Sequence, residues 1–136
     1  MKMTIGVAFA AATLATAAFA EGDAAKGESV FKKCKSCHMI ESPAGESIVK
    51  GGKTGPNLYG VIGRAAGSAD GFAYGDSLKA AGEKGLVWDE DSFEAYVQDP
   101  KGFLVEYTGD AGARTKMSFK LTKDYEDVYA YLAQFQ

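Results

Sequence analysis

One short segment of this chain holds every thiol and the single imidazole that it possesses. The two cysteines, Cys34 and Cys37, and the one histidine, His38, lie within five consecutive residues of a 136-residue sequence. A structural zinc site requires four nitrogen or sulfur ligands, and a catalytic triad requires a nucleophile and an orienting acid around its imidazole. Either kind of site would have to be built around His38, so most histidine chemistry is excluded elsewhere in the chain.

The order Cys-Lys-Ser-Cys-His is the attachment motif of c-type haem, in which two thiolates add to vinyl groups and the adjacent imidazole ligates iron. If the segment is helical, residues three and four apart share one face, so Cys34, Cys37 and His38 point at the same object.

A redox-active dithiol is an alternative, but it belongs at a strand-to-helix junction, and no strand is predicted before Cys34. A structural disulfide would need an unusually tight loop. A zinc site would lack two ligands unless acids or a second chain supplied them.

The second axial ligand of such a haem has few candidates. A pair of histidines is excluded because His38 stands alone. Met39 is tied beside His38 and cannot reach the far face of the ring, which leaves Met117. Filling the core is the more common role of a methionine. We nevertheless predict Met117 as the ligand, since a thioether opposite imidazole raises the reduction potential and closes the iron to oxygen and peroxide.

The first residues of the chain have the pattern of a secretory signal. A short positive start is followed by an Ala-rich uncharged run and by Ala18-Phe19-Ala20, which has the form of a cleavage site. The alternative is a membrane anchor, but a span requires about 18 or more strongly apolar residues. We predict that residues 1–20 are removed and that residues 21–136 form one domain in the periplasm, where a free dithiol would tend to be oxidised.

The rest of the chain predicts an all-α domain of four or five short helices with long loops. Helices are expected from a cap at Asp23 into the cysteine motif, from a cap at Asp76 to near Gly85, from near Asp89 to a stop at Pro100, and from a cap at Thr122 to the C-terminus. Residues 39–57 are rich in Gly and Pro and predict a loop, as do residues 107–114. Such short helices bury little apolar surface among themselves, so a haem would complete the core.

The charge balance argues against nucleic acid as a partner. Lys and Arg total 15 against 18 Asp and Glu, which gives a net charge of -3. Lysines nevertheless gather beside the segments expected around the haem, while acids cluster at residues 89–99. These lysines are Lys32, Lys33, Lys35, Lys50, Lys53, Lys116 and Lys120. We predict a positive face that orients acidic partners, although any one of these lysines could simply be solvated.

Several further motifs accompany the attachment motif. They are residues 27–31, 54–58 (TGPNL), 72–74 (FAY), Trp88, Tyr96, 116–119 (KMSF) and 130–132 (AYL). In these motifs the sequence resembles the class I c-type cytochromes, specifically the cytochrome c2 group of purple and related proteobacteria. The resemblance covers nearly all of residues 22–135 and implies the cytochrome c fold, with short helices and long loops wrapped around one covalently attached haem.

The resemblance also implies roles for individual residues. Cys34 and Cys37 would hold the haem, and His38 and Met117 would be the axial pair. The Pro56 carbonyl would accept a hydrogen bond from the imidazole of His38, which fixes the orientation and basicity of the ring. The propionates would be contacted by Arg64, Tyr74 and Trp88. Tyr96 would lie near the methionine sulfur, and Gly27, Phe31 and Tyr131 would join the first and last helices. Tyr and Trp are also ordinary core residues.

The function implied by the resemblance is that of a diffusible one-electron carrier and not an enzyme. It would take electrons from a cytochrome bc1-type complex and pass them to a photosynthetic reaction centre or a terminal oxidase, as a monomer without a membrane anchor. One alternative is a haem peroxidase or ligand sensor with an open distal position. Another is a non-haem periplasmic binding module with a Cys34–Cys37 disulfide. Residues 101–116 form a stretch longer than in the mitochondrial relatives, and no role is predicted for it.

Overall fold

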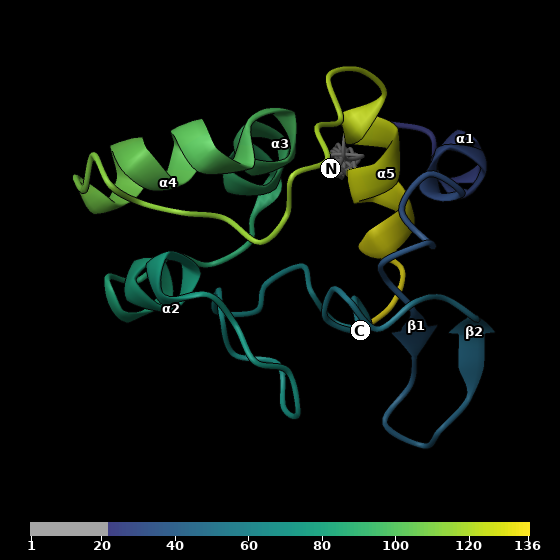
Figure 1. The fold of residues 1–136 in the computed structure, drawn as a ribbon. Helices are drawn as coiled ribbons and strands as arrows, with labels where there is room; N and C mark the ends of the chain where they lie inside the picture. Colours follow the sequence, from purple (N-terminus) through teal and green to yellow (C-terminus); the bar gives the residue numbers. More distant parts are fainter. Residues whose placement is uncertain (1–21) are drawn as a thin grey trace, which may run out of the picture.

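The computed structural model describes residues 22–136, in which short helices and one small hairpin are connected by long loops (Figure 1). The helices are α1 (Ala24–Phe31), α2 (Asp76–Glu83), α3 (Glu90–Gln98), α4 (Pro100–Thr108) and α5 (Tyr125–Leu132). The hairpin pairs β1 (Ile40–Glu41) with β2 (Ser47–Val49) in antiparallel register. The predicted all-α class is confirmed, whereas the predicted signal over residues 1–20 lies outside the described residues.

Helices α1 and α5 cross at backbone distance because of one glycine. A Cβ atom on Gly27 would overlap the main-chain carbonyl of Asp127 in α5. Beside this crossing, the rings of Phe31 and Tyr131 pack with their centroids 5.6 Å apart at 53°. The expected contact between the first and last helices is therefore confirmed, and any larger residue than glycine at position 27 would push them apart.

The same two helices are also joined by charge. Lys26 Nζ lies 2.8 Å from Asp124 Oδ1 and 3.0 Å from Asp127 Oδ2. The other oxygen of Asp127 accepts a hydrogen bond of 2.8 Å from the main-chain N–H of Asp23. Both partners lower the pKa of the Asp127 carboxyl below its ordinary value, the Asp23 bond most strongly. The buried carboxylate of Asp127 thus fastens the start of α1 to α5.

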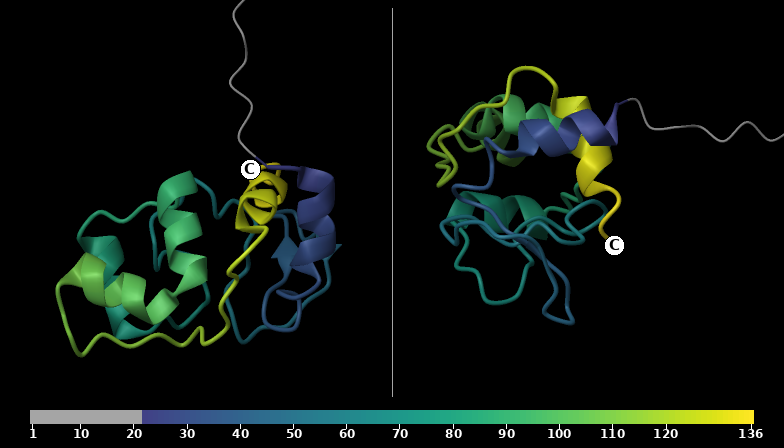
Figure 2. Two further views of the ribbon diagram at one scale, coloured as in Figure 1. Left: turned by 90° about the horizontal axis from the view of Figure 1, so that it is seen from above. Right: turned by 90° about the vertical axis from the view of Figure 1, so that its right-hand side faces the viewer.

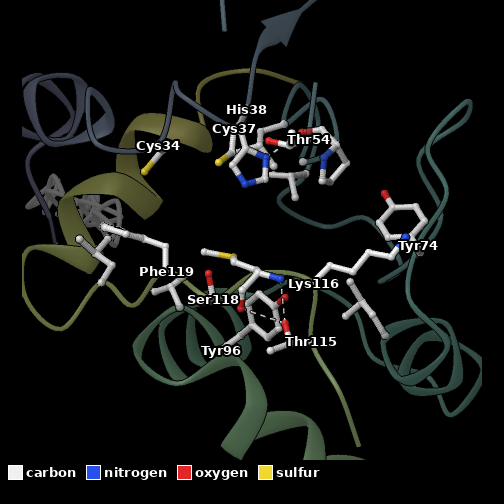
Figure 3. Close-up of a pocket in the computed structure, with 18 of the residues that line it drawn as sticks. Cys34, Cys37, His38, Thr54, Tyr74, Tyr96, Thr115, Lys116, Ser118 and Phe119 are labelled. Carbon is white, nitrogen blue, oxygen red and sulfur yellow. Dashed lines mark hydrogen bonds between the residues drawn. The ribbon is translucent and has the colours of Figure 1, made fainter. Parts of the chain in front are cut away.

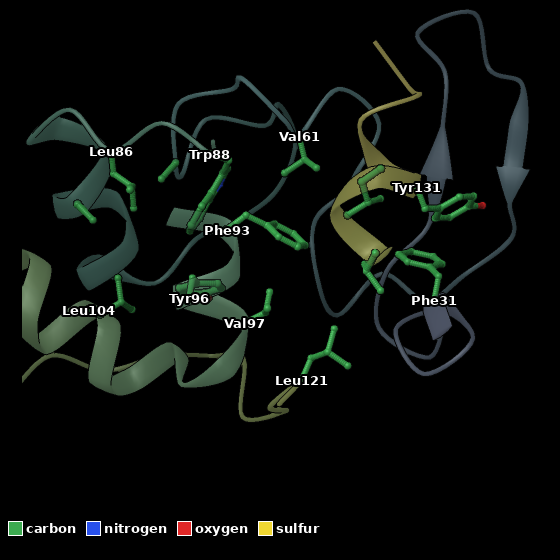
Figure 4. Close-up of a cluster of buried hydrophobic side chains, with 14 of the residues drawn as sticks. Phe31, Val61, Leu86, Trp88, Phe93, Tyr96, Val97, Leu104, Leu121 and Tyr131 are labelled. Atoms are coloured by element: carbon green, nitrogen blue, oxygen red, sulfur yellow. The ribbon is translucent and has the colours of Figure 1, made fainter. Parts of the chain in front are cut away.

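The elements form two layers, which the right-hand view of Figure 2 shows edge-on. Helices α1, α3, α4 and α5 make one layer, and α2, the hairpin and the loops around them make the other. The largest buried side chains of the first layer gather where these helices meet (Figure 4). They are Phe31, Phe93, Tyr96, Val97, Leu104, Tyr131 and Leu132. Among residues 22–136, none of the helices has the combination of length and apolarity needed to cross a bilayer.

Pro100 follows the end of one helix, as predicted, and begins a further helix that was not predicted. Helix α3 stops at Gln98 as expected, but α4 starts at Pro100 and runs to Thr108, so the predicted loop over residues 107–114 is wrong at its first two positions. Proline suits the first turn of a helix because its missing N–H has no partner there. The Asp99 side chain caps this turn by accepting from Gly102 N at 3.2 Å.

Three smaller boundaries also differ from the predictions. The predicted loop of residues 39–57 contains the hairpin, which Asn57 braces by accepting from Glu41 N at 3.0 Å and donating to Glu41 O at 2.8 Å. Helix α5 is preceded by Asp124 and not by Thr122, and α2 by Gly75 and not by Asp76. Asp89 is the cap of α3 as expected, and its side chain accepts from Ser92 N.

Candidate functional site

A cavity of about 380 Å³ lies between the two layers, within the size range of small-molecule and cofactor sites. All the predicted site residues line it, although they come from segments far apart in the sequence. They are Cys34, Cys37, His38, Pro56, Arg64, Tyr74, Trp88, Tyr96 and Met117. Much of the remaining wall is apolar, and includes Leu58, Val61, Phe93, Leu104 and Val128. The fold therefore gathers two thiols, an imidazole and a thioether around one apolar space.

The cysteine motif forms its own turn rather than a continuation of the first helix. Helix α1 ends at Phe31, which corrects the predicted extension into the motif. The carbonyl of Cys34 then accepts hydrogen bonds from Cys37 N at 3.1 Å and from His38 N at 2.9 Å. This turn places the three side chains on one wall of the cavity (Figure 3). Burial raises the pKa of the Cys34 thiol to about 11, whereas Cys37 is exposed.

The ring of His38 is locked in place from two sides. Its Nδ1 donates to the carbonyl of Pro56 at 2.9 Å, the pair of atoms that the resemblance implies. Burial lowers the pKa of His38, and the Pro56 bond opposes this shift. Since Nδ1 carries the proton, Nε2 keeps its lone pair free for a metal ion. A Cβ on Gly55 would overlap the ring, so the glycine is required for the loop to pack against it.

The opposite wall is the segment of residues 115–119 (Figure 3). Met117 is half-buried there. The Thr115 hydroxyl bonds both main-chain polar groups of this residue, donating to Met117 O at 3.0 Å and accepting from Met117 N at 3.1 Å. Burial raises the pKa of the nearby Tyr96 phenol, and interaction with the Thr115 hydroxyl opposes this shift. Thr115 therefore connects the main chain of Met117 to α3.

At one edge of the cavity lies the guanidinium of Arg64, which has one N–H group without a hydrogen-bond partner among the described residues. Arg64 donates from one terminal nitrogen to Tyr59 O and from the other to Asn57 O, each at 3.2 Å. Its Nε is buried and has no partner within residues 22–136. Burial lowers the pKa of Arg64, and Tyr74 opposes the shift. A buried guanidinium N–H without a partner is costly and is satisfied best by a carboxylate.

These residues fit a c-type haem. The thiols and the imidazole share one wall, the thioether occupies the facing segment, and the free Nε of Arg64 matches a propionate. The alternatives fit less well. Helix α1 and not a strand precedes Cys34, and no group of three or more His, Cys, Asp or Glu within residues 22–136 is placed to hold a metal ion. Both cysteines carry free thiols.

Some lysines of the predicted positive face already have a bonding partner in the structure, whereas others are exposed. Lys33 and Lys116 line the cavity, and the lysines of this face are exposed. Lys35 lies beside the segment that carries Lys50 and Lys53, because Gly52 N donates to Lys35 O at 2.9 Å. By contrast, Lys116 donates to Ala73 O at 2.7 Å. Lys120 pairs with Asp99 at 3.4 Å.

Some residues that hold the cysteine motif and the Met117 segment in place are not predicted from the sequence. One of them is Thr115, although a Ser or Thr hydroxyl commonly bonds main-chain groups two residues further along the chain. Gly51 and Gly52 were predicted only as loop residues, yet a Cβ on either would overlap the backbone of the cysteine motif. The density of glycine before Pro56 was therefore a sign of close packing as well as of a loop.

Comparison with known proteins gives consistent matches over the whole chain. The sequence is 59% identical over 133 residues to cytochrome c-551 of Roseobacter denitrificans, covering 98% of this chain and 95% of that protein. It is 55% identical over 134 residues to cytochrome c2 of Rhodobacter capsulatus, covering 98% and 97%. No family model matches.

Solved structures match equally well. The crystal structure of ferric cytochrome c-550 from Paracoccus versutus aligns with a TM-score of 0.82 and 59% identity, over 85% of this chain and 98% of that one. Cytochrome c2 from Paracoccus denitrificans aligns with a TM-score of 0.82 and 56% identity, over 84% and 96%. Both the sequence and the arrangement of its elements are thus those of one group of proteins.

Proposed function

The chain belongs to the cytochrome c2 family, and from this premise we propose that it carries single electrons through a haem ligated by His38 and Met117. The family, the fold, the single covalently bound haem and the absence of an enzymatic role agree with the predictions from sequence. The proposal concerns two further points: which residues of this chain hold the haem, and which surface faces the redox partners.

The ligand assignment is supported by the arrangement of the two cavity walls. Cys34 and Cys37 would form the thioether links, and His38 would offer the Nε2 that its bond to Pro56 leaves free. Met117 would approach from the facing segment with its backbone already set by Thr115. When bound, the haem supplies an iron couple that changes by one electron. The observation that carries the proposal is the single cavity shared by these four side chains.

The remaining polar residues would orient the group and exclude water. Arg64 would donate its free Nε to a propionate, and Tyr74 and Trp88 lie on the same cavity. Trp88 packs on Tyr96 with centroids 4.8 Å apart, which closes the wall between α3 and the loop before it. A dry, preset site lowers the reorganisation that accompanies a change of charge, because fixed dipoles replace mobile water.

The partners would be membrane redox complexes outside the cytoplasm. A cytochrome bc1-type complex would be the donor, and a reaction centre or terminal oxidase the acceptor. The signal predicted over residues 1–20 supports a periplasmic location, with residues 21–136 as the mature monomer. The docking face would be the lysine-rich surface beside the cavity, formed by Lys32, Lys33, Lys35, Lys53, Lys116 and Lys120. Its charge would accelerate encounters with acidic partners.

A ligand challenge of the purified holoprotein tests the proposal. We expect a covalent haem that survives acid-acetone extraction, and a reduced spectrum that carbon monoxide does not change at neutral pH. Carbon monoxide binding to the reduced form would instead indicate the peroxidase or sensor alternative, since Met117 would then leave the iron open. A colourless protein with a Cys34–Cys37 disulfide would indicate the binding-module alternative.

A further inference from the structure

One hydrogen bond joins the two rims of the cavity next to Met117. The ammonium of Lys116 donates to the carbonyl of Ala73 at 2.7 Å, across a separation of 43 residues. The aliphatic stem of Lys116 passes Gly75, where a Cβ atom would sit 3.6–4.0 Å from three of its carbons. Lys116, Tyr74 and Gly75 all line the cavity, and Figure 3 shows the Lys116 side chain extending toward Tyr74. The side chain therefore spans the mouth of the site.

The other anchors of this segment lie farther from Met117, lie within the segment itself, or join it through Thr115 and Tyr96 to α3, which borders the same side of the cavity (Figure 3). Thr115 bonds Met117 locally and crosses no gap with those bonds. Arg114 N donates to Ser77 Oγ at 2.9 Å, and Leu121 N donates to Val97 O at 2.8 Å, three and four residues from Met117. Within residues 22–136, Lys116 supplies the nearest bond that holds the Met117 segment to the opposite rim.

We propose that Lys116 is a positioning residue that latches the Met117 segment over the cavity and so restricts the entry of external ligands to the iron. The inference rests on the proposed ligation by Met117. An external ligand can bind only in the population whose segment has swung open, and its apparent affinity scales with that population. Opening this segment requires the Lys116–Ala73 bond to break. Loss of the ammonium should therefore raise the open population while the Thr115 bonds to Met117 stay in place.

Imidazole titration of the ferric holoprotein tests the latch. Neutral imidazole is suitable because removal of a protein charge does not itself change its attraction to the site. We expect Lys116→Leu, which keeps an apolar side chain and removes the donor without adding a possible iron ligand, to bind imidazole about three- to tenfold more tightly than the unaltered protein. Lys116→Arg, which restores a cationic donor, should recover at least part of the difference.

Lys120→Leu is the matched control. This substitution removes the same charge close to the Met117 segment, but the bond that it breaks is an exposed ion pair with Asp99 that does not cross the cavity. We expect its imidazole affinity to stay within twofold of the unaltered protein. Equal imidazole affinities for Lys116→Leu and Lys120→Leu would overturn the latch. If instead the unaltered ferric protein lacks the charge-transfer band of sulfur-ligated haem, it is the ligation by Met117 that fails.

Discussion

His38 Nδ1 and the Pro56 carbonyl are joined by a 2.9 Å hydrogen bond, and Gly55 lies directly against the same ring. The bond fixes the tautomer, and the glycine fixes how closely the loop approaches. Together they leave Nε2 as the free nitrogen at the cavity wall. The position of the imidazole is thus set by a loop outside the cysteine motif. A substitution in this loop can therefore disturb the site while all the proposed haem-binding residues remain unchanged.

Replacing Gly55 with alanine should destabilise the holoprotein by about 2–3 kcal/mol, because the new Cβ would overlap His38 and the ring or the loop must move. Urea unfolding followed by far-UV circular dichroism measures the difference. Gly75→Ala is the control, since its Cβ would meet only ordinary contacts with the Lys116 stem and should change stability by less than about 0.5 kcal/mol. Equal stabilities of the two variants would show that the loop can move to accommodate the new Cβ atom without a cost in stability.

Met117→Ala should leave the haem attached but lower the midpoint potential. Thioether ligation favours reduced iron, and axial ligands tune potentials over a range of about 0.8 V, so a fall on the order of 100 mV is expected. The variant should also bind carbon monoxide when reduced. Redox titration with an optical readout measures both effects. Met39→Ala, adjacent to His38, is the control and should keep the potential. An unchanged potential in Met117→Ala would contradict the assignment.

The cysteine motif and the candidate ligand Met117 could be proposed from the sequence because the chemistry expected of them depends on residue type and on local spacing. A single histidine and two methionines beyond residue 20 leave few combinations. Pro56, Arg64, Tyr74, Trp88 and Tyr96 lie on one cavity only because the chain folds back on itself, and periodicity does not report such contacts. Without the family resemblance they would have remained ordinary loop and core residues.

The parts that sequence reasoning missed share a different cause. Helix α4 contains Gly102, which lowers its local propensity, and Pro100, although suited to a first turn, predicts a helix stop when it follows a helical pattern. Helix α4 is therefore stabilised by tertiary contacts. One of these is Lys84, whose ammonium donates to Thr108 O at 3.0 Å and covers the end of α4. The β1–β2 hairpin has very short strands and is braced by Asn57. Elements that are stabilised by residues distant in the sequence are not predicted well from local hydrophobic patterns and propensities.

Asp127→Asn should weaken the α1–α5 contact in a pH-dependent way. The hydrogen bond from Asp23 N and the pairing with Lys26 lower the pKa of Asp127 below its unfolded value of about 3.9. Its stabilisation is therefore complete above that pH and is lost as pH falls through the lower native value. We expect the variant to cost about 1 kcal/mol at pH 7, less than the roughly 1.5–3 kcal/mol of a hydrogen bond to a charged group because the Asn amide oxygen can still accept from Asp23 N, and less again near pH 3.

Urea unfolding at the two pH values measures this change. Asp91→Asn is the control, because Asp91 is exposed in the first turn of α3 and away from this network. A loss of stability in Asp127→Asn that is the same at pH 7 and pH 3 would mean that the carboxylate charge is not what joins the helices.

Reversing charge at Lys33 and Lys35 should slow electron exchange with an acidic partner while leaving the spectrum unchanged. Lys33 lines the cavity, and Lys35 lies beside the segment of Lys50 and Lys53, so the change is made where the predicted positive face is densest. Steering by charge can change association rates by tenfold or more, and salt screens it beyond a distance of about 10 Å at 0.1 M. We expect Lys33→Glu with Lys35→Glu to react at least about tenfold more slowly at low salt.

The difference should shrink as salt is added, which separates steering from damage to the site. Stopped-flow reduction by a purified cytochrome bc1-type complex measures the rates at low and high ionic strength. Lys79→Glu on α2 is the control, since Lys79 is exposed but lies outside the predicted face. Uncharged diffusion is the same for every variant, so a difference in rate at low salt reports the charges that face the acidic groups of the partner during encounter. Equal low-salt rates for the double variant and the unaltered protein would place the docking face elsewhere on the molecule.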